Sequence, residues 1–271
     1  MLYTKMHGAG NSFVILENLH GELQGEDLSG LALRLCSAES GPGADGMIVL
    51  VPALSGEDFG MLFYNSDGSL GEMCGNGARC VARYGVEHGF AADPAHIVFR
   101  ATAGLIYARR IDETQYEVRL NNPSVIDLHR PVRVGERVFD CAYVELGEPG
   151  IPHAVVETPE DDFADLDALR ERGRALRHSP AFPRGANVSF VCVTSSQSVR
   201  ALTFERGVED FTLACGTGSG SIVLTLLLRG RLSGDRAAVD MPGGRLSVRL
   251  VREGDAVRDL FLTGPTAYVD P

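Results

Sequence analysis

The sequence has 271 residues and a net charge of −11, so it is long enough for one large domain or two medium ones, each with its own core. A chain this acidic, without a cluster of lysine and arginine, is not expected to bind nucleic acid, and its longest apolar stretch, residues 222–228, is too short to span a bilayer. Lys5 is the only lysine and has no phosphate-binding motif beside it, which argues against pyridoxal phosphate, and no cysteine or histidine spacing suggests a metal; we expect no cofactor.

Alternating or β-branched residues predict strands along much of the chain. In chain order these strands cover residues 13–17, 46–51, 60–64, 117–120, 153–157, 188–193, 200–204 and 260–269. The clearest helix outside the glycine-rich segments covers residues 165–177. This pattern predicts a mixed α/β (α+β) fold with two lobes. We expect an N-terminal lobe of residues 1–120, joined by the C-terminal segment 259–271, and a C-terminal lobe of residues 121–258.

The chain contains an internal repeat of about half its length. Cys74-Gly75-Asn76-Gly77 matches Cys215-Gly216-Thr217-Gly218, and an apolar-rich helix is predicted after each. Each helix meets a glycine fifteen residues after its cysteine, Gly89 and Gly230, where a C-terminal glycine cap belongs. Downstream, a turn glycine and an alternating strand follow at nearly equal spacing. The repeat predicts two similar, mostly β lobes, each holding one helix.

The repeated element is suited to binding and stabilising anions. Asn76 and Thr217 are good N-cap residues, so each cysteine is expected just before a helix N-terminus. The N–H groups and the positive end of the helix should lower the thiol pKa and could hold a substrate carboxylate. If the lobes are related by a pseudo-two-fold axis, one thiol stands on each face of an amino-acid α-carbon. That arrangement suits stereoinversion, in which one group removes the proton and the other returns one.

The other cysteines are expected to have no chemical role. Cys36, Cys80, Cys141 and Cys192 lack the glycine-rich surroundings, and buried cysteine is usually packing. An even number of cysteines could form disulfides, and a structural Cys74–Cys215 disulfide is the main alternative to catalysis. The first residues show no secretory pattern, however, and the chain can build a core without disulfides. We therefore expect a cytoplasmic, thiol-reduced protein.

Seven segments, in order, resemble the diaminopimelate epimerase family along nearly the whole chain. They are residues 5–11, 43–46, 64–68, 73–80, 152–153, 187–190 and 205–207 leading into 214–218. The resemblance implies interconversion of LL- and meso-diaminopimelate in lysine and cell-wall precursor synthesis, without a cofactor. It also implies two pseudo-symmetric lobes, each a β-barrel-like sheet around a central helix. The expected partner is a small amino-acid substrate, and a homodimer is left open.

The resemblance assigns roles to individual residues. Cys74 and Cys215 would be the acid/base pair, Glu205 would meet an ammonium group or assist proton transfer, and His153 would support Glu205. The backbone of Gly75, Asn76, Gly216 and Thr217 would hold the reacting carboxylate, and Asn11, Asn65, Asn187 and Arg206 would bind other polar groups of the substrate. Taken alone, these polar residues also fit ordinary roles: turn residues, a strand histidine and a surface ion pair.

One position departs from the family pattern. The family commonly has Gly-Asn-Pro-His where this chain has Gly150-Ile151-Pro152-His153, and that Asn contacts the substrate. Ile151 can neither donate nor accept a hydrogen bond, and the loss of a polar partner can shift specificity. Two alternatives therefore stay open. One is a related cofactor-independent two-cysteine racemase acting on another amino acid, and the other is a non-catalytic module that binds an anion at the two helix N-termini.

Overall fold

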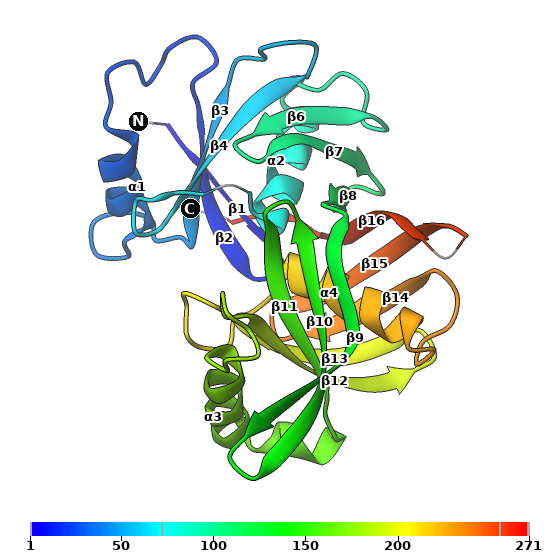
Figure 1. The fold of residues 1–271 in the computed structure, drawn as a ribbon. Helices are drawn as coiled ribbons and strands as arrows, with labels where there is room; N and C mark the ends of the chain where they lie inside the picture. The colour runs from blue at the N-terminus through cyan, green and yellow to red at the C-terminus, as the bar shows by residue number, and fades with distance from the viewer. Residues whose placement is uncertain (1, 72, 255, 270–271) are drawn as a thin grey trace. The chain divides into compact units, whose positions relative to one another are not determined.

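A computed structural model describes residues 2–71, 73–254 and 256–269. The chain forms two compact units, one made of the residues up to Arg119 together with those from Thr263 onward, and the other made of Leu120–Leu262. Figure 1 labels the elements of both units.

In its described residues, the first unit carries two helices and a sheet of mixed direction. Its elements are β1 (Thr4–Gly8), β2 (Asn11–Glu17), α1 (Leu28–Cys36), β3 (Gly46–Val51), β4 (Phe59–Asn65), β5 (Leu70–Gly71), α2 (Gly75–Glu87), β6 (Ile97–Ala101), β7 (Gly104–Arg110), β8 (Gln115–Leu120) and β17 (Ala267–Tyr268). The end of β16 (Ala256–Pro265) pairs with β8, and β17 pairs with β1. The last segment of the chain therefore bonds to both edges of this sheet, which gives the sheet its barrel-like form.

The second unit repeats this plan. Its elements are β9 (Pro123–Val134), β10 (Arg137–Gly147), β11 (Gly150–Glu157), a 3-10 helix η1 (Glu160–Ala164), α3 (Leu166–Arg177), β12 (Asn187–Ser195), β13 (Ser198–Phe204), α4 (Gly216–Leu228), β14 (Arg236–Met241), β15 (Gly244–Glu253) and most of β16. In the first unit β1–β2, β3–β4 and β6–β7 are antiparallel, whereas β2–β3 and β4–β6 are parallel. In the second unit β10–β11, β12–β13 and β14–β15 are antiparallel, whereas β11–β12 and β13–β14 are parallel. The sequence repeat is thus a repeat of topology.

A central helix fills the sheet of each unit. α2 packs against β1, β2 and β7, and α4 packs against β10, β11, β12, β14 and β15. Residues 218–227 of α4 are all buried, which is typical of a helix enclosed on every side. The expected α/β fold, with a barrel-like sheet around a central helix in each unit, is confirmed. α1 and α3 pack outside, against separate hydrophobic clusters that include Leu31 and Leu169.

The predicted ends of the central helices are partly right. Gly89 and Gly230 follow the C-caps of α2 and α4 with φ of +74° and +68°, the left-handed conformation expected of a glycine at that position. The predicted N-caps are wrong. The helices begin at Gly75 and Gly216, so the cysteines themselves occupy the N-cap positions.

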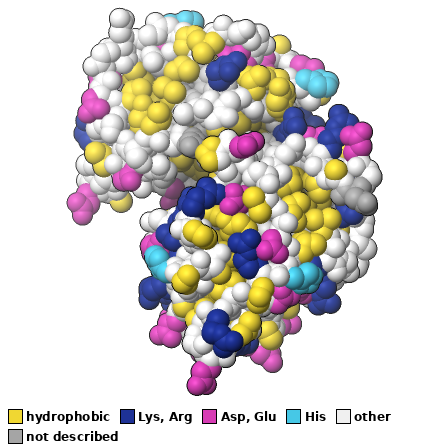
Figure 2. Space-filling view, in the orientation of Figure 1, with side chains coloured by type: hydrophobic (Ala, Val, Ile, Leu, Met, Phe, Trp, Pro, Cys, Tyr) yellow, Lys and Arg dark blue, Asp and Glu magenta, His cyan; other side chains and the backbone are white. Residues whose placement is uncertain are grey.

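The surface carries charges of both signs. On the face drawn in Figure 2, arginine and lysine side chains are interspersed with Asp and Glu, and they do not gather in one basic patch. Many charged side chains of the protein form ion pairs, such as Arg170 with Asp210 and Arg231 with Glu157. No helix in the described part of the chain is long and apolar enough to cross a membrane.

Candidate active site

Cys74 has an extended backbone directly before α2. Its φ and ψ are −128° and 118°, and the helix starts at the next residue, so Cys74 occupies the N-cap position. The thiol is partly exposed. Of the residues predicted around it, Gly75 and Asn76 form that first turn.

Asn76 and Asn11 form a hydrogen-bonded pair beside Cys74. Asn76 is 3% exposed, and its Nδ2 donates to Oδ1 of Asn11 at 2.6 Å. Asn11 starts β2 after a tight two-residue turn, in which Ala9 and Gly10 both have positive φ. The hairpin lies close against α2, since a Cβ added to Gly8 would stand 2.8 Å from the Asn76 carbonyl oxygen. The turn thus sets the position of Asn11 against the helix.

Asn65 lies at the same end of the first sheet. Gly46, the first residue of β3, pairs with Asn65, the last residue of β4. The parallel β2–β3 register brings the start of β2 to the same end of the strands. Asn65 Nδ2 donates to Oγ of Ser69 at 2.9 Å, within the turn that precedes β5. The Asn65 side chain therefore stabilises the turn after β4, the structural role that its sequence context also fits.

Cys215 has the matching position before α4. Its φ and ψ are −123° and 110°, close to those of Cys74, and its sulfur accepts a hydrogen bond from Gly218 N at 3.4 Å. The Thr217 hydroxyl lies 3.8 Å from the same sulfur and 3.0 Å from Nε2 of His153. His153 is completely buried, and this burial lowers its pKa to about 3, so the ring is neutral at neutral pH. His153 therefore contacts Thr217 directly, and the support of Glu205 by His153 stays a prediction.

A carboxylate faces the Cys215 thiol. Glu205 and the Cys215 thiol act on each other's ionisation, and Glu205 accepts a hydrogen bond from Thr212 Oγ1. Burial raises the pKa of Cys215 well above its usual range, and the nearby Glu205 charge raises that pKa further. Burial also raises the pKa of Glu205. The prediction of a lowered thiol pKa is therefore wrong for Cys215, because desolvation and a facing anion outweigh the helix N-terminus.

Asn187 lies on a strand next to this site, and Arg206 lies in the turn after β13. Asn187 starts β12 and pairs with His153 on β11, and its Oδ1 accepts a hydrogen bond from Arg206 N at 2.8 Å. The Arg206 guanidinium is exposed and donates to the carbonyl of Arg184. Arg184 in turn donates to the carbonyl of Gly150, next to Ile151. The departure from the family pattern thus lies in the strand that carries His153.

The predicted site residues divide between the two units. In the first unit Gly75 and Asn76 directly follow Cys74, Asn11 is bonded to Asn76, and Asn65 lies at the same end of the sheet as Asn11. Around Cys215 they are His153, Glu205, Gly216 and Thr217, with Asn187 and Arg206 beside them. The sequence reading missed Arg79, which lies inside the glycine-rich motif and is fully buried beneath Asn76. An arginine shortly after the glycine-rich turn was the available signal.

The remaining cysteines are packing residues, as expected. All six cysteines are free thiols. Cys36 and Cys141 belong to the hydrophobic clusters outside the central helices, Cys80 is fully buried on α2, and Cys192 packs partly buried against β-strand neighbours. Burial raises the pKa of Cys36 to about 11 and that of Cys80 and Cys141 to about 12, so these thiols stay protonated.

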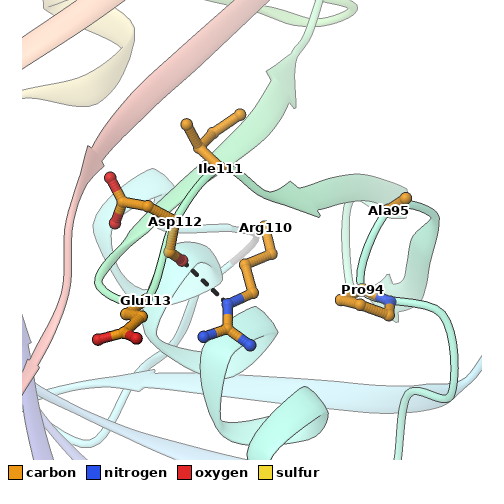
Figure 3. Close-up of a pocket in the computed structure, with 6 residues that line it drawn as sticks. All are labelled: Pro94, Ala95, Arg110, Ile111, Asp112 and Glu113. Carbon is orange, nitrogen blue, oxygen red and sulfur yellow. Dashed lines mark hydrogen bonds between the residues drawn. The ribbon is translucent and has the colours of Figure 1, made fainter.

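The part of the chain that the structure describes holds no cluster of three His, Cys, Asp or Glu side chains placed to bind a metal ion. A shallow cavity in the first unit lies near the β7–β8 turn, lined by residues 94–95 and 110–113 (Figure 3). Arg110 Nε donates to the Asp112 carbonyl there at 3.0 Å. None of the predicted site residues lines this cavity.

Comparison with solved structures identifies the fold. A Bacillus anthracis phenazine biosynthesis protein of the PhzF family aligns over 100% of this chain and 98% of its own, with a TM-score of 0.74 and 13% identity. A probable proline racemase from Agrobacterium radiobacter K84 aligns over 98% of this chain and 90% of its own, with a TM-score of 0.72 and 18% identity. The chain therefore has the fold that proline racemase-like and PhzF-like proteins share.

Comparison of sequences identifies the family. Residues 3–125 and 148–269 match the family described as diaminopimelate epimerase. The diaminopimelate epimerase of Hydrogenobaculum sp. (strain Y04AAS1) is 36% identical over 277 residues, covering 99% of this chain and 96% of its own. The chain belongs to the diaminopimelate epimerase family, and so to the isomerases.

Proposed function

We propose that this protein interconverts LL- and meso-diaminopimelate by a cofactor-free mechanism with two bases, Cys74 and Cys215. The observation that carries the proposal is the matched geometry of the two thiols. Each is the N-cap of the central helix of its unit, in nearly the same backbone conformation and with the same glycine-rich first turn. Two such thiols can serve one α-carbon from opposite faces.

The chemistry follows from what these groups can do. One thiolate removes the α-proton, the other thiol delivers a proton to the opposite face, and the two roles exchange in the reverse reaction. The backbone N–H groups of the first turns, at Gly75–Asn76 and Gly216–Thr217, stabilise the charge that develops on the carboxylate. No bond to a cofactor is needed for this sequence of proton transfers.

The other site residues bind and orient. In this proposal Glu205 binds the substrate ammonium group beside Cys215, and Asn11, Asn65 and Asn187 hydrogen-bond other polar groups. Arg206, whose guanidinium is exposed, meets the distal carboxylate. His153 positions the Thr217 hydroxyl against the sulfur of Cys215. Lysine and cell-wall precursor synthesis in the cytoplasm is the setting that this activity implies.

The test uses hydrogen exchange. The reduced protein is incubated with LL-diaminopimelate in deuterated water, and meso product and α-deuterium are measured by NMR and chiral chromatography. Product carrying α-deuterium is expected. Cys74→Ala and Cys215→Ala should each abolish racemisation, whereas Cys192→Ala, which removes a partly buried thiol of β12, should keep near wild-type turnover. Near wild-type turnover in either of the first two variants would show that the two-base mechanism is wrong.

Ile151 favours a second candidate, a two-cysteine racemase for another amino acid. A panel of amino acids in the same exchange assay separates the two functions. If diaminopimelate is the substrate, it exchanges faster than any other member of the panel. Faster exchange of an amino acid without a distal carboxylate and ammonium would favour the second candidate. Exchange with no amino acid would leave only an anion-binding role for the two helix N-termini.

A further inference from the structure

Glu209 has a backbone conformation that residues with a side chain rarely adopt. Its φ is +60°, and in the described part of the chain Ala9 is the other residue besides glycines with a positive φ. Such a conformation is costly for a residue with a Cβ, and it persists where the surrounding contacts hold it. Glu209 belongs to the loop of residues 205–210, which an antiparallel bridge between Phe204 and Phe211 closes. Its conformation therefore points to contacts that give this loop a defined shape.

Glu209 bonds to the chain on both sides of Arg206. Its backbone N donates to the carbonyl of Glu205 at 2.8 Å, and its Oε1 accepts a hydrogen bond from the backbone N of Gly207 at 3.0 Å. Arg206 lies between these two residues, and its own backbone N donates to Oδ1 of Asn187 at 2.8 Å. The backbone that carries the exposed Arg206 guanidinium is thus fixed before, at and after this residue.

Arg177, the last residue of α3, contacts both segments that hold Arg206. Its Nε and Nη2 lie 3.1 and 3.0 Å from Oε1 of Glu209, and its side chain is 15% exposed. It also lies against Gly185, since a Cβ added there would stand 1.9 Å from Nη1 of Arg177. Gly185 directly follows Arg184, whose carbonyl accepts a hydrogen bond from the Arg206 guanidinium at 3.1 Å. One largely buried arginine therefore connects the loop that carries Arg206 with the segment that its guanidinium contacts.

A second arginine on the same face of α3 holds the end of this loop. Arg170 stands seven residues before Arg177, and its Nε donates to Oδ1 of Asp210 at 2.7 Å. The hydrogen bond from Gly207 N and the charge of Arg177 lower the pKa of Glu209, so its carboxylate is ionised at neutral pH. Ion pairs near the surface add little to stability. Their effect here falls on the geometry of the loop.

We propose that Glu209, held by Arg177, is a positioning residue that fixes the Arg206 guanidinium for the distal carboxylate of the substrate. The proposal deepens the proposed function and rests on it for the role of Arg206. It also gives α3, which packs outside the sheet against β12 and β13, a part in substrate binding. Because the Glu209 side chain acts through Arg206, its loss should raise KM more than it lowers kcat.

The experiment compares KM and kcat for LL-diaminopimelate in Glu209→Gly, in Arg206→Gln and in the double variant. Glu209→Gly removes the carboxylate but also relieves the left-handed backbone, so the urea midpoint should not fall. Its KM should nevertheless rise about tenfold, as expected when a charged hydrogen bond to the substrate is weakened. In the Arg206→Gln background, Glu209→Gly should change KM by less than about twofold, because the two residues act as one unit.

Arg172→Gln is the matched control on the same helix. It removes an ion pair with Asp162, in η1, and should leave KM unchanged, whereas Arg177→Gln should raise KM as Glu209→Gly does. The order of the loop is measured without substrate, by amide hydrogen–deuterium exchange of peptides that cover residues 205–211. Amide exchange there should be faster in Glu209→Gly than in the unmodified protein, and Arg172→Gln should not change it.

Two kinetic outcomes would overturn the proposal. One is a KM in Glu209→Gly equal to that of the unmodified protein, and the other is the same rise in KM with and without the Arg206 guanidinium. If the unmodified protein turns over no amino acid, the proposed function is wrong, and the amide exchange then decides separately. Faster exchange in Glu209→Gly would support the hold of Glu209 on the Arg206 loop, and unchanged exchange would refute it.

Discussion

The contact between Thr217 and His153 gives a prediction with a defined size. Thr217→Val keeps the shape of the side chain but removes the hydroxyl that lies 3.0 Å from His153 Nε2. His153 is completely buried and its Nδ1 already has no partner, so the variant leaves both ring nitrogens unpaired. The free energy of unfolding should fall by about 1–3 kcal/mol, the usual cost of a buried polar group that loses its partner.

Thr225→Val is the matched control, two turns further along the same helix. The Thr225 hydroxyl is buried and already lacks a partner, so its replacement by a methyl group should change the free energy of unfolding by less than about 0.5 kcal/mol or raise it. Urea titrations followed by circular dichroism compare the two variants, and the exchange assay measures turnover. Thr217→Val should also lower turnover, because the hydroxyl near the Cys215 sulfur is lost. Equal stability of the two variants would refute the assignment of the His153–Thr217 hydrogen bond.

Three further predictions concern protonation and packing. The pKa of His153 is about 3 in the folded state, below its ordinary value of 6.5, so the unfolded state binds an extra proton in this range. The free energy of unfolding should therefore fall as the pH drops below about 6.5, by up to about 1.4 kcal/mol per pH unit. His153→Asn should flatten this slope in urea titrations between pH 5 and 7. Glu205→Gln removes the anion that raises the pKa of Cys215. The rate of Cys215 alkylation by iodoacetamide, measured as a function of pH, should therefore rise at lower pH than in the unmodified protein. An unchanged pH profile would contradict the effect of Glu205 on the thiol. Gly8→Ala places a methyl group against the backbone of α2, so it should lower the free energy of unfolding by about 1–3 kcal/mol and reduce turnover. Ala9→Gly relieves a positive φ and should change the free energy of unfolding by less than about 1 kcal/mol. Urea titrations measure both variants, and a larger loss of stability in Ala9→Gly than in Gly8→Ala would contradict the hairpin geometry.

The sequence predicts the parts of this fold that depend on local patterns. The spacing from each cysteine to Gly89 or Gly230 predicts where the central helices end, and both glycines take the left-handed conformation that terminates a helix. β3 runs over residues 46–51, as expected, because it is a buried, β-branched stretch. By contrast β9, over Pro123–Val134, has only one fully buried residue, so no strong hydrophobic alternation marks it. The 260–269 strand proves to be β16 and β17, separated at Thr266.

Properties that depend on three-dimensional surroundings could not be predicted. Asn76 and Thr217 suit the N-cap by type, yet their side chains bond to Asn11 and His153 from inside the first turn. The ionisation of Cys215 depends on burial and on the carboxylate of Glu205, which directly follows β13, and its own motif encodes neither. Sequence motifs identified the residues around each thiol, whereas their electrostatics required the structure.

The charge differences between the repeats bear on how a two-base reaction starts. Such a reaction needs one ionised and one protonated thiol before substrate is turned over, and a site with identical halves would give neither thiol the preference. In this chain the backbone around Cys74 and Cys215 is nearly the same, but the Glu205 carboxylate raises the pKa of the Cys215 thiol. The repeat therefore preserves the geometry that places the two cysteines, while Glu205 favours the protonated form of Cys215. Replacing the Glu205 carboxylate by an uncharged amide should weaken that preference without moving the backbone of the cysteines.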